Sequence, residues 1–273
     1  MNVGSTDSDS TDRKSGGTGF DSGRAHREPG SRPYFLVDRV PPTGPYLLTG
    51  PEGRHAATVK RLRAGENLVL TDGLGALADA VVTEVRRGEL NVEVGPPTIV
   101  EPPAVRVTLV QALPKGDRGE LAVELATEAG VDRVLPWAAQ RCVARWKSAD
   151  QAAKGAERWR AAAREAAKQS RRPFVPPVTD LASSVTVAEL ISHSAAALVL
   201  HDAAAAPLRT VPIPGGGDVV LIVGPEGGLT EEELTMFTAA GAVPVRLGPQ
   251  VLRTSTAGAV ALGALGVLTG RWT

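Results

Sequence analysis

Two short segments near the C-terminus combine glycine, proline and polar residues in a way that could hold a ligand. The first, residues 224–228 with the sequence GPEGG, directly follows the apolar run 219–223. The second, residues 247–254 with the sequence LGPQVLRT, follows a short apolar stretch that begins at Val243. Apolar runs of this kind are typical of strands buried on both faces of a parallel sheet. Ligands bind such sheets at the carboxyl ends of the strands, so the two segments predict a site built from loops at one sheet edge.

The residues around the first segment indicate which ligand it would accept. Thr230 and Glu233 have the spacing of a capping box, which predicts a helix that runs to about Ala240. Glycines before a helix can also bind phosphate, but here no lysine follows them and the spacing is not GxGxxG. Glu226 and the glutamates at 231–233 would repel a phosphate. The segment therefore favours a ligand with cationic or neutral polar groups, such as S-adenosylmethionine with its sulfonium and ammonium.

A third apolar run, residues 195–200, ends in His201 and Asp202. This pair could transfer protons or line a pocket, and pocket lining is favoured because no serine or cysteine is placed to complete a triad. The helix predicted from Thr254 or Ser255 toward Gly270 is rich in alanine and glycine. It is expected to be a buried packing helix or part of a subunit interface.

The pattern of strands and turns predicts two domains after an N-terminal tail. Residues 1–30 carry almost no apolar side chains and are predicted to be a disordered tail. Residues 31–97 read as a small β-barrel with one basic helix at 55–63, and prolines at 96–97 and 102–103 indicate a stiff connector. Residues 104–273 alternate strands with helices, including one helix at about 150–170, which predicts an α/β domain with a mainly parallel sheet.

Composition excludes several classes of protein, but it is compatible with a soluble enzyme that acts on nucleic acid. The single Cys142 excludes an intramolecular disulfide and a cysteine-based zinc site, and a small buried residue is the favoured interpretation. No metal site, signal peptide or membrane span is expected, so the cytoplasm is the predicted compartment. Lysine plus arginine and aspartate plus glutamate each number 30, so the formal net charge is zero.

A basic segment is nevertheless concealed in the neutral chain. Residues 133–172 contain eleven lysines and arginines against three acidic residues, a net charge of +8. Such a segment suits the phosphate backbone of RNA, although an ordinary solvated helix face is the alternative. Trp159 falls on the apolar stripe of the predicted helix and is expected in the core. Because only 4% of residues are aromatic, recognition of RNA shape and phosphates is favoured over base stacking.

Several stretches resemble one protein family. LIVGPEGGLTEEE and VRLGPQVLRTSTAGAVALGAL resemble the C-terminal signature of the ribosomal RNA small subunit methyltransferase E family, part of the SPOUT class of trefoil-knotted methyltransferases. HAATVKRLRAGENLVLTDGLG resembles its PUA-like N-terminal RNA-binding domain, and RCVARWK with RWRAAAREAAKQSRRPFVPPV resembles its central region. The resemblance spans about residues 32–272. It departs at Leu125, where many relatives carry lysine.

The resemblance implies a fold and an activity. The fold would be a SPOUT trefoil-knot methyltransferase domain with a mainly parallel sheet, preceded by a PUA-like β-barrel. The activity would be methyl transfer from S-adenosylmethionine to N3 of a uridine in 16S rRNA of the small ribosomal subunit, by a homodimer. Two alternatives stay open: a SPOUT enzyme that modifies tRNA or a ribose 2′-hydroxyl, and a ribosome-assembly factor that binds RNA without catalysis.

The resemblance also assigns residues to roles. Arg253, Arg32 and Arg172 are the candidates that would position the base or stabilise its anion, and no convincing general base is visible. The expected cofactor-binding residues are Leu200, His201, Gly224, Pro225, Glu226, Gly227, Leu247, Gly248, Leu252 and Thr254. The expected RNA-binding residues are Lys60, Arg61, Arg63, Lys115, Arg118, Arg141, Lys147, Arg171 and Arg172. For Lys60, Arg61 and Arg63, an ordinary solvated face is an equal alternative.

Overall fold

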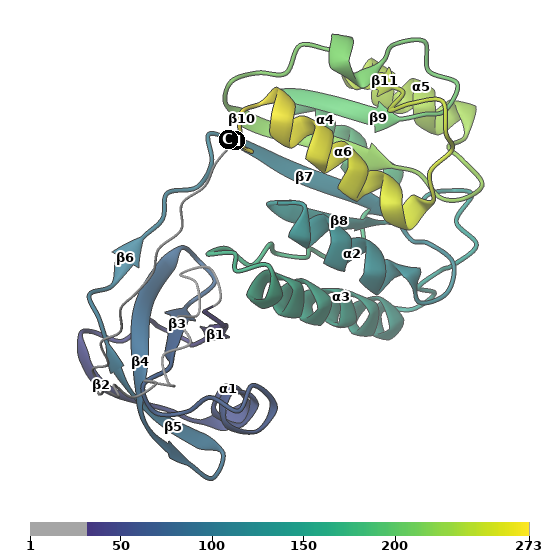
Figure 1. Cartoon of the computed structure of the whole chain (residues 1–273). Helices are drawn as coiled ribbons and strands as arrows, with labels where there is room; N and C mark the ends of the chain where they lie inside the picture. Colours follow the sequence, from purple (N-terminus) through teal and green to yellow (C-terminus); the bar gives the residue numbers. More distant parts are fainter. Residues whose placement is uncertain (1–31, 273) are drawn as a thin grey trace, which may run out of the picture. The chain divides into compact units, whose positions relative to one another are not determined.

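The structure is a computed structural model that describes residues 32–272. The predicted disordered tail at 1–30 lies outside the described residues. Among those residues the chain forms two separate sheets, one at each end of the described sequence (Figure 1). This arrangement is the α/β fold with two kinds of sheet that the sequence predicts. The trefoil knot stays a prediction, as does the domain boundary between 97 and 104.

The N-terminal sheet is mixed and closes around its own core. Its strands are β1 (Tyr34–Leu36), β2 (Gly44–Leu48), β3 (Asn67–Thr71), β4 (Ala76–Arg86), β5 (Glu89–Val94) and β6 (Thr98–Ile99). They follow the order β1-β3-β4-β5-β2, with β6 paired to β4, and only the β1–β3 pair is parallel. Phe35, Leu70 and Leu90 are fully buried between these strands. The alternation of apolar and polar residues in β4 and β5 is what places one face inside and the other in water.

The prediction of a helix at residues 55–63 is wrong about where the helix begins and where it ends. The observed helical segment consists of α1 (Gly50–Arg54) and a π-helical turn, η1 (His55–Val59). It begins earlier because Pro51 occupies the first turn, where its fixed φ and missing N–H are tolerated. It ends before 63 because Arg61 adopts a left-handed backbone with φ of 52°. The positively charged side chains of this segment therefore lie on a turn and not on a helix.

The C-terminal sheet is entirely parallel. Its strands are β7 (Val105–Ala112), β8 (Arg133–Trp137), β9 (Ala196–Leu200), β10 (Gly217–Val223) and β11 (Val243–Val245), in the order β11-β9-β10-β7-β8. The central strand β10 is buried from residue 219 to 223, as its uniformly apolar sequence predicts. Because every strand points the same way, all five carboxyl ends meet at one edge of the sheet.

Helices cover both faces of this sheet. They are α2 (Arg118–Glu128), α3 (Ala149–Gln169), α4 (Ser184–Ser192), α5 (Glu231–Ala239) and α6 (Thr254–Leu268), with a short 3-10 turn at η2 (Leu208–Thr210). Figure 1 shows α2 and α6 across one face, with α3 beside α2 and α4 behind the sheet. In the part of the chain that the structure describes, none of the helices has the combination of length and apolar character that crossing a bilayer requires.

Two glycines let α3 pack closely against its neighbours. A Cβ atom on Gly119 of α2 would lie 2.5 Å from Nε1 of Trp159, and one on Gly155 of α3 would lie 2.3 Å from the Trp146 ring. The two indole rings meet edge to face at 5.5 Å. Trp159 is 2% exposed, which confirms its predicted place in the core. The tryptophans thus fix the segment before α3 against the first turn of α2.

Candidate active site

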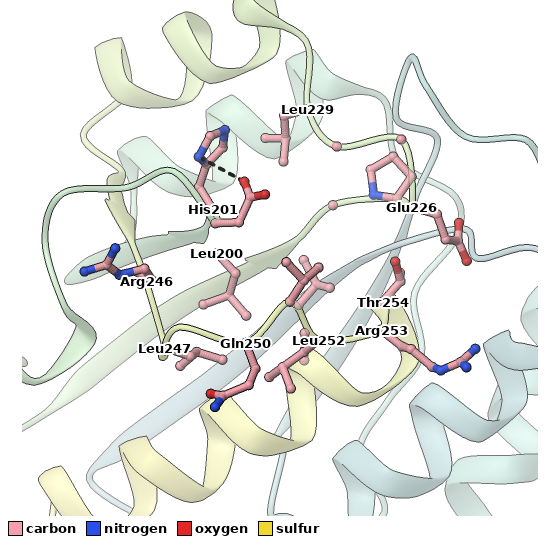
Figure 2. Close-up of a pocket in the computed structure, with 18 of the residues that line it drawn as sticks. Leu200, His201, Glu226, Leu229, Arg246, Leu247, Gln250, Leu252, Arg253 and Thr254 are labelled. Carbon is pink, nitrogen blue, oxygen red and sulfur yellow. Dashed lines mark ion pairs between the residues drawn. The ribbon is translucent and has the colours of Figure 1, made fainter.

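A pocket of about 650 Å³ lies at the carboxyl ends of β9, β10 and β11, where the sequence predicts a ligand site. All ten residues that the sequence assigns to the cofactor line it: Leu200, His201, Gly224, Pro225, Glu226, Gly227, Leu247, Gly248, Leu252 and Thr254. The candidate catalytic residue Arg253 lines it as well, and so do Arg118 and Arg141. The parallel sheet therefore brings three segments that are far apart in sequence to one cavity (Figure 2).

The first pocket turn, residues 224–228, is shaped by its glycines. Gly228 has a φ of 71°, and its N–H donates to the carbonyl of Pro225 at 2.9 Å, which closes the turn. A Cβ atom on Gly224 would lie 2.6 Å from Cδ1 of Leu229. Glycine at these positions permits the positive φ and the close contact, and leaves bare backbone facing the cavity.

The helix that follows this turn begins at the predicted capping box. The Oγ1 of Thr230 accepts from the N–H of Glu233 at 3.1 Å, and the Glu233 carboxylate accepts from the N–H of Thr230 at 3.1 Å. Glu233 is fully buried, and its Oε1 also accepts from the N–H of Gln140 at 2.8 Å and the hydroxyl of Ser184 at 3.0 Å. The same carboxylate thus caps α5 and joins it to two other segments. The sequence predicted the cap but not this second role.

Glu226 ties the first pocket turn to the loop after β7. Its Oε1 accepts from the backbone N–H of Lys115 at 3.2 Å. Lys115 is exposed, and the exposed Arg118 lines the pocket. The carboxyl group of Glu226 thus belongs to a residue that lines the cavity, where the sequence predicts a ligand that is not a phosphate.

The second pocket loop is anchored by Gln111, which the sequence analysis missed. This side chain is 1% exposed at the end of β7, and its Nε2 donates to the carbonyls of Ala112 at 3.1 Å and Thr254 at 3.4 Å. A Cβ atom on Gly258 would lie 3.1 Å from Leu109, so α6 approaches β7 closely. The signal that could have found Gln111 is its position as a polar residue next to the carboxyl end of a parallel strand.

His201 and Asp202 make the turn after β9. The N–H of Ala203 donates to Nδ1 of His201 at 3.2 Å and to Oδ1 of Asp202 at 2.9 Å, and Nδ1 lies 3.7 Å from the same carboxylate oxygen. The arrangement supports the favoured interpretation of this pair as pocket lining.

Polar and charged side chains lie at two opposite sides of the cavity. Figure 2 shows Arg253 and Glu226 on one side and Arg246 and His201 on the other, with leucines between them. Gln250 lies in the predicted segment 247–254 but was given no role, and Arg246 was not predicted, although it directly follows a parallel strand and could have been found by the same rule as Leu247. An apolar middle with polar ends suits a ligand that combines an aromatic base with a charged amino acid.

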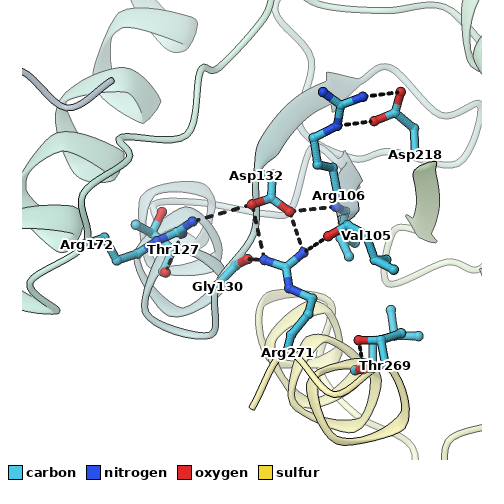
Figure 3. Close-up of polar contacts among 11 residues, drawn as sticks. Val105, Arg106, Thr127, Gly130, Asp132, Arg172, Asp218, Thr269 and Arg271 are labelled. Atoms are coloured by element: carbon cyan, nitrogen blue, oxygen red, sulfur yellow. Dashed lines mark hydrogen bonds and ion pairs between the residues drawn. The ribbon is translucent and has the colours of Figure 1, made fainter. Parts of the chain in front are cut away.

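Arg172 is not in the pocket, which corrects its prediction as a catalytic and RNA-binding residue. Its Nη1 donates to the carbonyl of Thr127 at 2.8 Å, and its Nη2 lies 3.8 Å from Oδ1 of Asp132 (Figure 3). Burial lowers its pKa to about 10, against the opposing effect of Asp132. The Arg172 side chain is only 14% exposed, so most of its guanidinium is occupied by contacts within the fold.

Arg32, the third catalytic candidate, belongs to the N-terminal sheet in the described structure. Its Nη1 lies 2.5 Å from Oδ1 of Asp79 on β4, and it is not among the residues that line the pocket. The pair is largely exposed, so the side chain can exchange this partner for another at little cost.

The predicted basic surface is less charged than the sequence suggests. Several cations of α3 have acidic partners: Lys154 with Asp150, Arg158 with Glu120, Arg160 with Asp180, and Arg164 with Glu157. Lys168 bonds Glu52 at 2.8 Å and Glu165 at 2.9 Å; burial opposes its charge, but these two bonds raise its pKa overall. The exposed predicted cations are Lys60, Arg61, Arg63, Lys115, Arg118, Arg141, Lys147 and Arg171.

Comparison with protein families identifies the class to which this fold and pocket belong. Residues 101–266 match the RNA methyltransferase domain family, and residues 48–95 match the RNA methyltransferase PUA domain family. The chain is therefore an RNA methyltransferase of the SPOUT type with an N-terminal PUA domain.

The relatives identify the particular family. The chain is 53% identical over 243 residues to ribosomal RNA small subunit methyltransferase E of Mycobacterium bovis, covering 87% of this chain and 92% of the relative. It is 31% identical to the Bacillus subtilis protein of the same name, covering 82% of this chain and 90% of that protein. The chain belongs to the ribosomal RNA small subunit methyltransferase E family.

A solved structure agrees with this assignment. The crystal structure of ribosomal RNA small subunit methyltransferase E from Neisseria gonorrhoeae, bound to S-adenosyl methionine, matches with a TM-score of 0.76 and 30% identity. The match covers 87% of this chain and 98% of that one. A putative methyltransferase from Legionella pneumophila, also in complex with S-adenosyl methionine, matches with a TM-score of 0.74.

Proposed function

We propose that this chain methylates N3 of a uridine in 16S rRNA of the small ribosomal subunit, U1498 in the numbering used for the family, with S-adenosylmethionine as methyl donor. One observation carries the proposal. The two segments that resemble the family's C-terminal signature and the strand end at residues 200–202 form a single pocket at the edge of the parallel sheet. The related Neisseria gonorrhoeae protein was crystallised with this cofactor.

The residues of the pocket fit S-adenosylmethionine. Bare backbone at Gly224 and Gly227 permits close approach, while Leu200, Leu247 and Leu252 supply an apolar surface for an adenine ring. Glu226 and Asp202 are carboxylates suited to a sulfonium or an ammonium. When bound, the cofactor would supply a methyl group that its sulfonium already activates. The protein is left to align the acceptor nitrogen and to stabilise charge on the acceptor.

Arg253 is the residue best placed to act on the uracil. Its side chain is exposed at the cavity, and its backbone stands directly before α6. N3 of uracil becomes nucleophilic when it loses its proton, and the negative charge that results spreads onto the two carbonyl oxygens of the ring. A guanidinium can donate to one of these oxygens and stabilise the anion. Arg32 keeps a proposed role as a second contact to the RNA.

The RNA would contact exposed cations from both sheets. On the C-terminal domain, RNA phosphates would be bound by Lys115, Arg118, Lys147 before α3 and Arg171 after it. Lys60, Arg61 and Arg63 would do the same on the PUA domain. The ion-paired cations of α3 contribute less, because each would first have to leave its acidic partner.

The proposal includes a homodimer that works in the cytoplasm on the small subunit. Support comes from α6, where Val260 in the middle of the helix and Val267 and Leu268 at its C-terminal end are 44%, 69% and 47% exposed. An apolar helix face of this kind suits a second copy of the chain. Light scattering at micromolar concentration tests it, and a monomer would contradict it.

The substrate class is tested by methyl transfer from labelled S-adenosylmethionine. Small subunits that lack the modification would be compared with free 16S rRNA and with tRNA. Label in the small subunit or its RNA is expected. Label in tRNA alone would favour the alternative SPOUT activity, and cofactor binding without any transfer would favour an RNA-binding factor.

A further inference from the structure

The loop at residues 139–142 lies directly against the first pocket turn. Nη1 of Arg141 donates to the carbonyl of Gly227 at 3.3 Å and to the carbonyl of Leu229 at 3.1 Å. The backbone contact is equally close, because a Cβ atom on Gly227 would lie 3.3 Å from Cβ of Arg141 and 3.4 Å from its carbonyl oxygen. The Arg141 guanidinium therefore bonds the carbonyls of the two residues on either side of Gly228.

The loop that carries Arg141 is itself fixed. The N–H of Gln140 donates to the buried carboxylate of Glu233, which also caps the helix that follows the turn. On the opposite side, Glu226 of the turn accepts from the N–H of Lys115. The turn is thus bonded through Glu226 to the N–H of Lys115, and Arg141 bonds the carbonyls of Gly227 at its end and Leu229 just after it.

We propose that Arg141 is a positioning residue that holds the turn at 224–228 in its cofactor-binding shape; this inference rests on the proposed cofactor. The turn is rich in glycine, and its shape is therefore weakly specified by its own sequence. A guanidinium with several fixed donors can bond two carbonyls at once, which a lysine ammonium does with less geometric definition. Arg141 therefore acts on the cofactor through the turn, in addition to any contact its remaining N–H groups make with RNA.

This role separates Arg141 from the other cations around the pocket. A cation that only contacts RNA phosphates affects RNA affinity and its salt dependence, and leaves cofactor affinity in the absence of RNA unchanged. A positioning residue of the cofactor turn affects cofactor affinity without any RNA present. The two roles are therefore distinguished by a binding measurement on the protein alone.

The test is calorimetric titration of the full chain with S-adenosylmethionine, for the native protein and for Arg141→Gln, Arg141→Lys and Arg145→Gln. Arg141→Gln should weaken binding about tenfold or more, as expected for the loss of hydrogen bonds from a charged donor. Arg141→Lys should recover part of the loss. Arg145→Gln is the matched control, because Arg145 lies four residues further along the connection between β8 and α3 and, among the described residues, donates to the carbonyl of Gln140 and not to the pocket turn.

Steady-state kinetics should likewise separate an effect on cofactor binding from an effect on the chemical step. With small subunits as methyl acceptor, Arg141→Gln should raise KM for the cofactor and leave kcat at saturating cofactor within about threefold, because the chemistry is unchanged once the turn is occupied. The melting temperature should change by no more than a few degrees, since the side chain is exposed.

Three outcomes would overturn the inference or its premise. Equal cofactor affinity in Arg141→Gln and the native chain would overturn the positioning role while leaving the proposed function intact. Equal weakening by Arg145→Gln would reduce the effect to loss of charge and overturn it as well. Absence of cofactor binding by the native chain would instead contradict the proposed function.

Discussion

Arg271 forms a bidentate ion pair with Asp132, with one bond to each carboxylate oxygen. Nη1 lies 2.5 Å from Oδ2 and Nη2 lies 3.2 Å from Oδ1, and the two nitrogens also bond the carbonyls of Val105 and Gly130 (Figure 3). Asp132 in turn accepts from the N–H of Val107 at 2.7 Å. Arg271, three residues after the end of α6, is therefore bonded to the first strand of the C-terminal sheet.

The first prediction concerns this pair. Arg271→Ala leaves a largely buried carboxylate without its main partner and should lower the free energy of unfolding by about 3–5 kcal/mol. Arg106→Ala, which breaks the neighbouring exposed pair with Asp218, should cost no more than about 1 kcal/mol. Denaturant unfolding of both variants measures the difference. Equal losses would contradict the distinction drawn between the two pairs.

The second prediction concerns Arg253. Arg253→Ala should lower kcat by roughly 10²–10³-fold, the range seen when one donor to a developing anion is removed. Its affinity for S-adenosylmethionine, measured by titration, should stay within about threefold. Arg209→Ala, on an exposed turn outside the pocket, is the control and should leave both values unchanged. Parallel loss of turnover and cofactor affinity would make Arg253 a cofactor-binding residue.

The third prediction concerns the cap of α5. Thr230→Ala removes the Oγ1 that accepts from Glu233 and should destabilise the protein by about 1 kcal/mol. Thr238→Ala on the same helix removes only a hydroxyl that bonds the carbonyl of Leu234, and should cost less than about 0.5 kcal/mol. Thermal unfolding of the two variants compares them, and a larger loss in Thr238→Ala would argue against the cap.

The fourth prediction concerns Cys142. Burial raises the pKa of its thiol above the ordinary value of 9.0, so the folded protein should not react with a thiol reagent at neutral pH and should react once unfolded. The sign of the pH effect follows. Above the ordinary pKa the unfolded chain loses this proton while the folded chain keeps it, so the contribution of Cys142 to stability falls as pH rises. Fast labelling of the folded protein would contradict its burial.

The pocket could be predicted from the sequence because its parts are local. Each lining segment follows an apolar strand and contains the glycines or prolines that end it, so strand ends and loop residues are visible in one window of sequence. The parallel order of the strands then brings these windows together without further information. This is why the positions predicted to bind the cofactor, from Leu200 to Thr254, all line one cavity.

The wrong predictions concern features that no local stretch of sequence determines. Arg172 looks like part of a basic surface, but its partners Thr127 and Asp132 lie some 40 residues away in sequence, and no local pattern reports them. Arg141 reads as another surface cation for the same reason, because its bonds go to Gly227 and Leu229. The helix at 55–63 was misplaced because its end depends on a left-handed backbone at Arg61, a residue type with no preference for it.

The most direct test of the central claim is the identity of the methylated nucleoside. Small subunits lacking the modification would be incubated with the chain and labelled S-adenosylmethionine, and their RNA digested to nucleosides for mass analysis. The account predicts N3-methyluridine from 16S rRNA as the labelled product, and its loss in Arg253→Ala. A ribose-methylated nucleoside, or label on a base other than uracil, would contradict it.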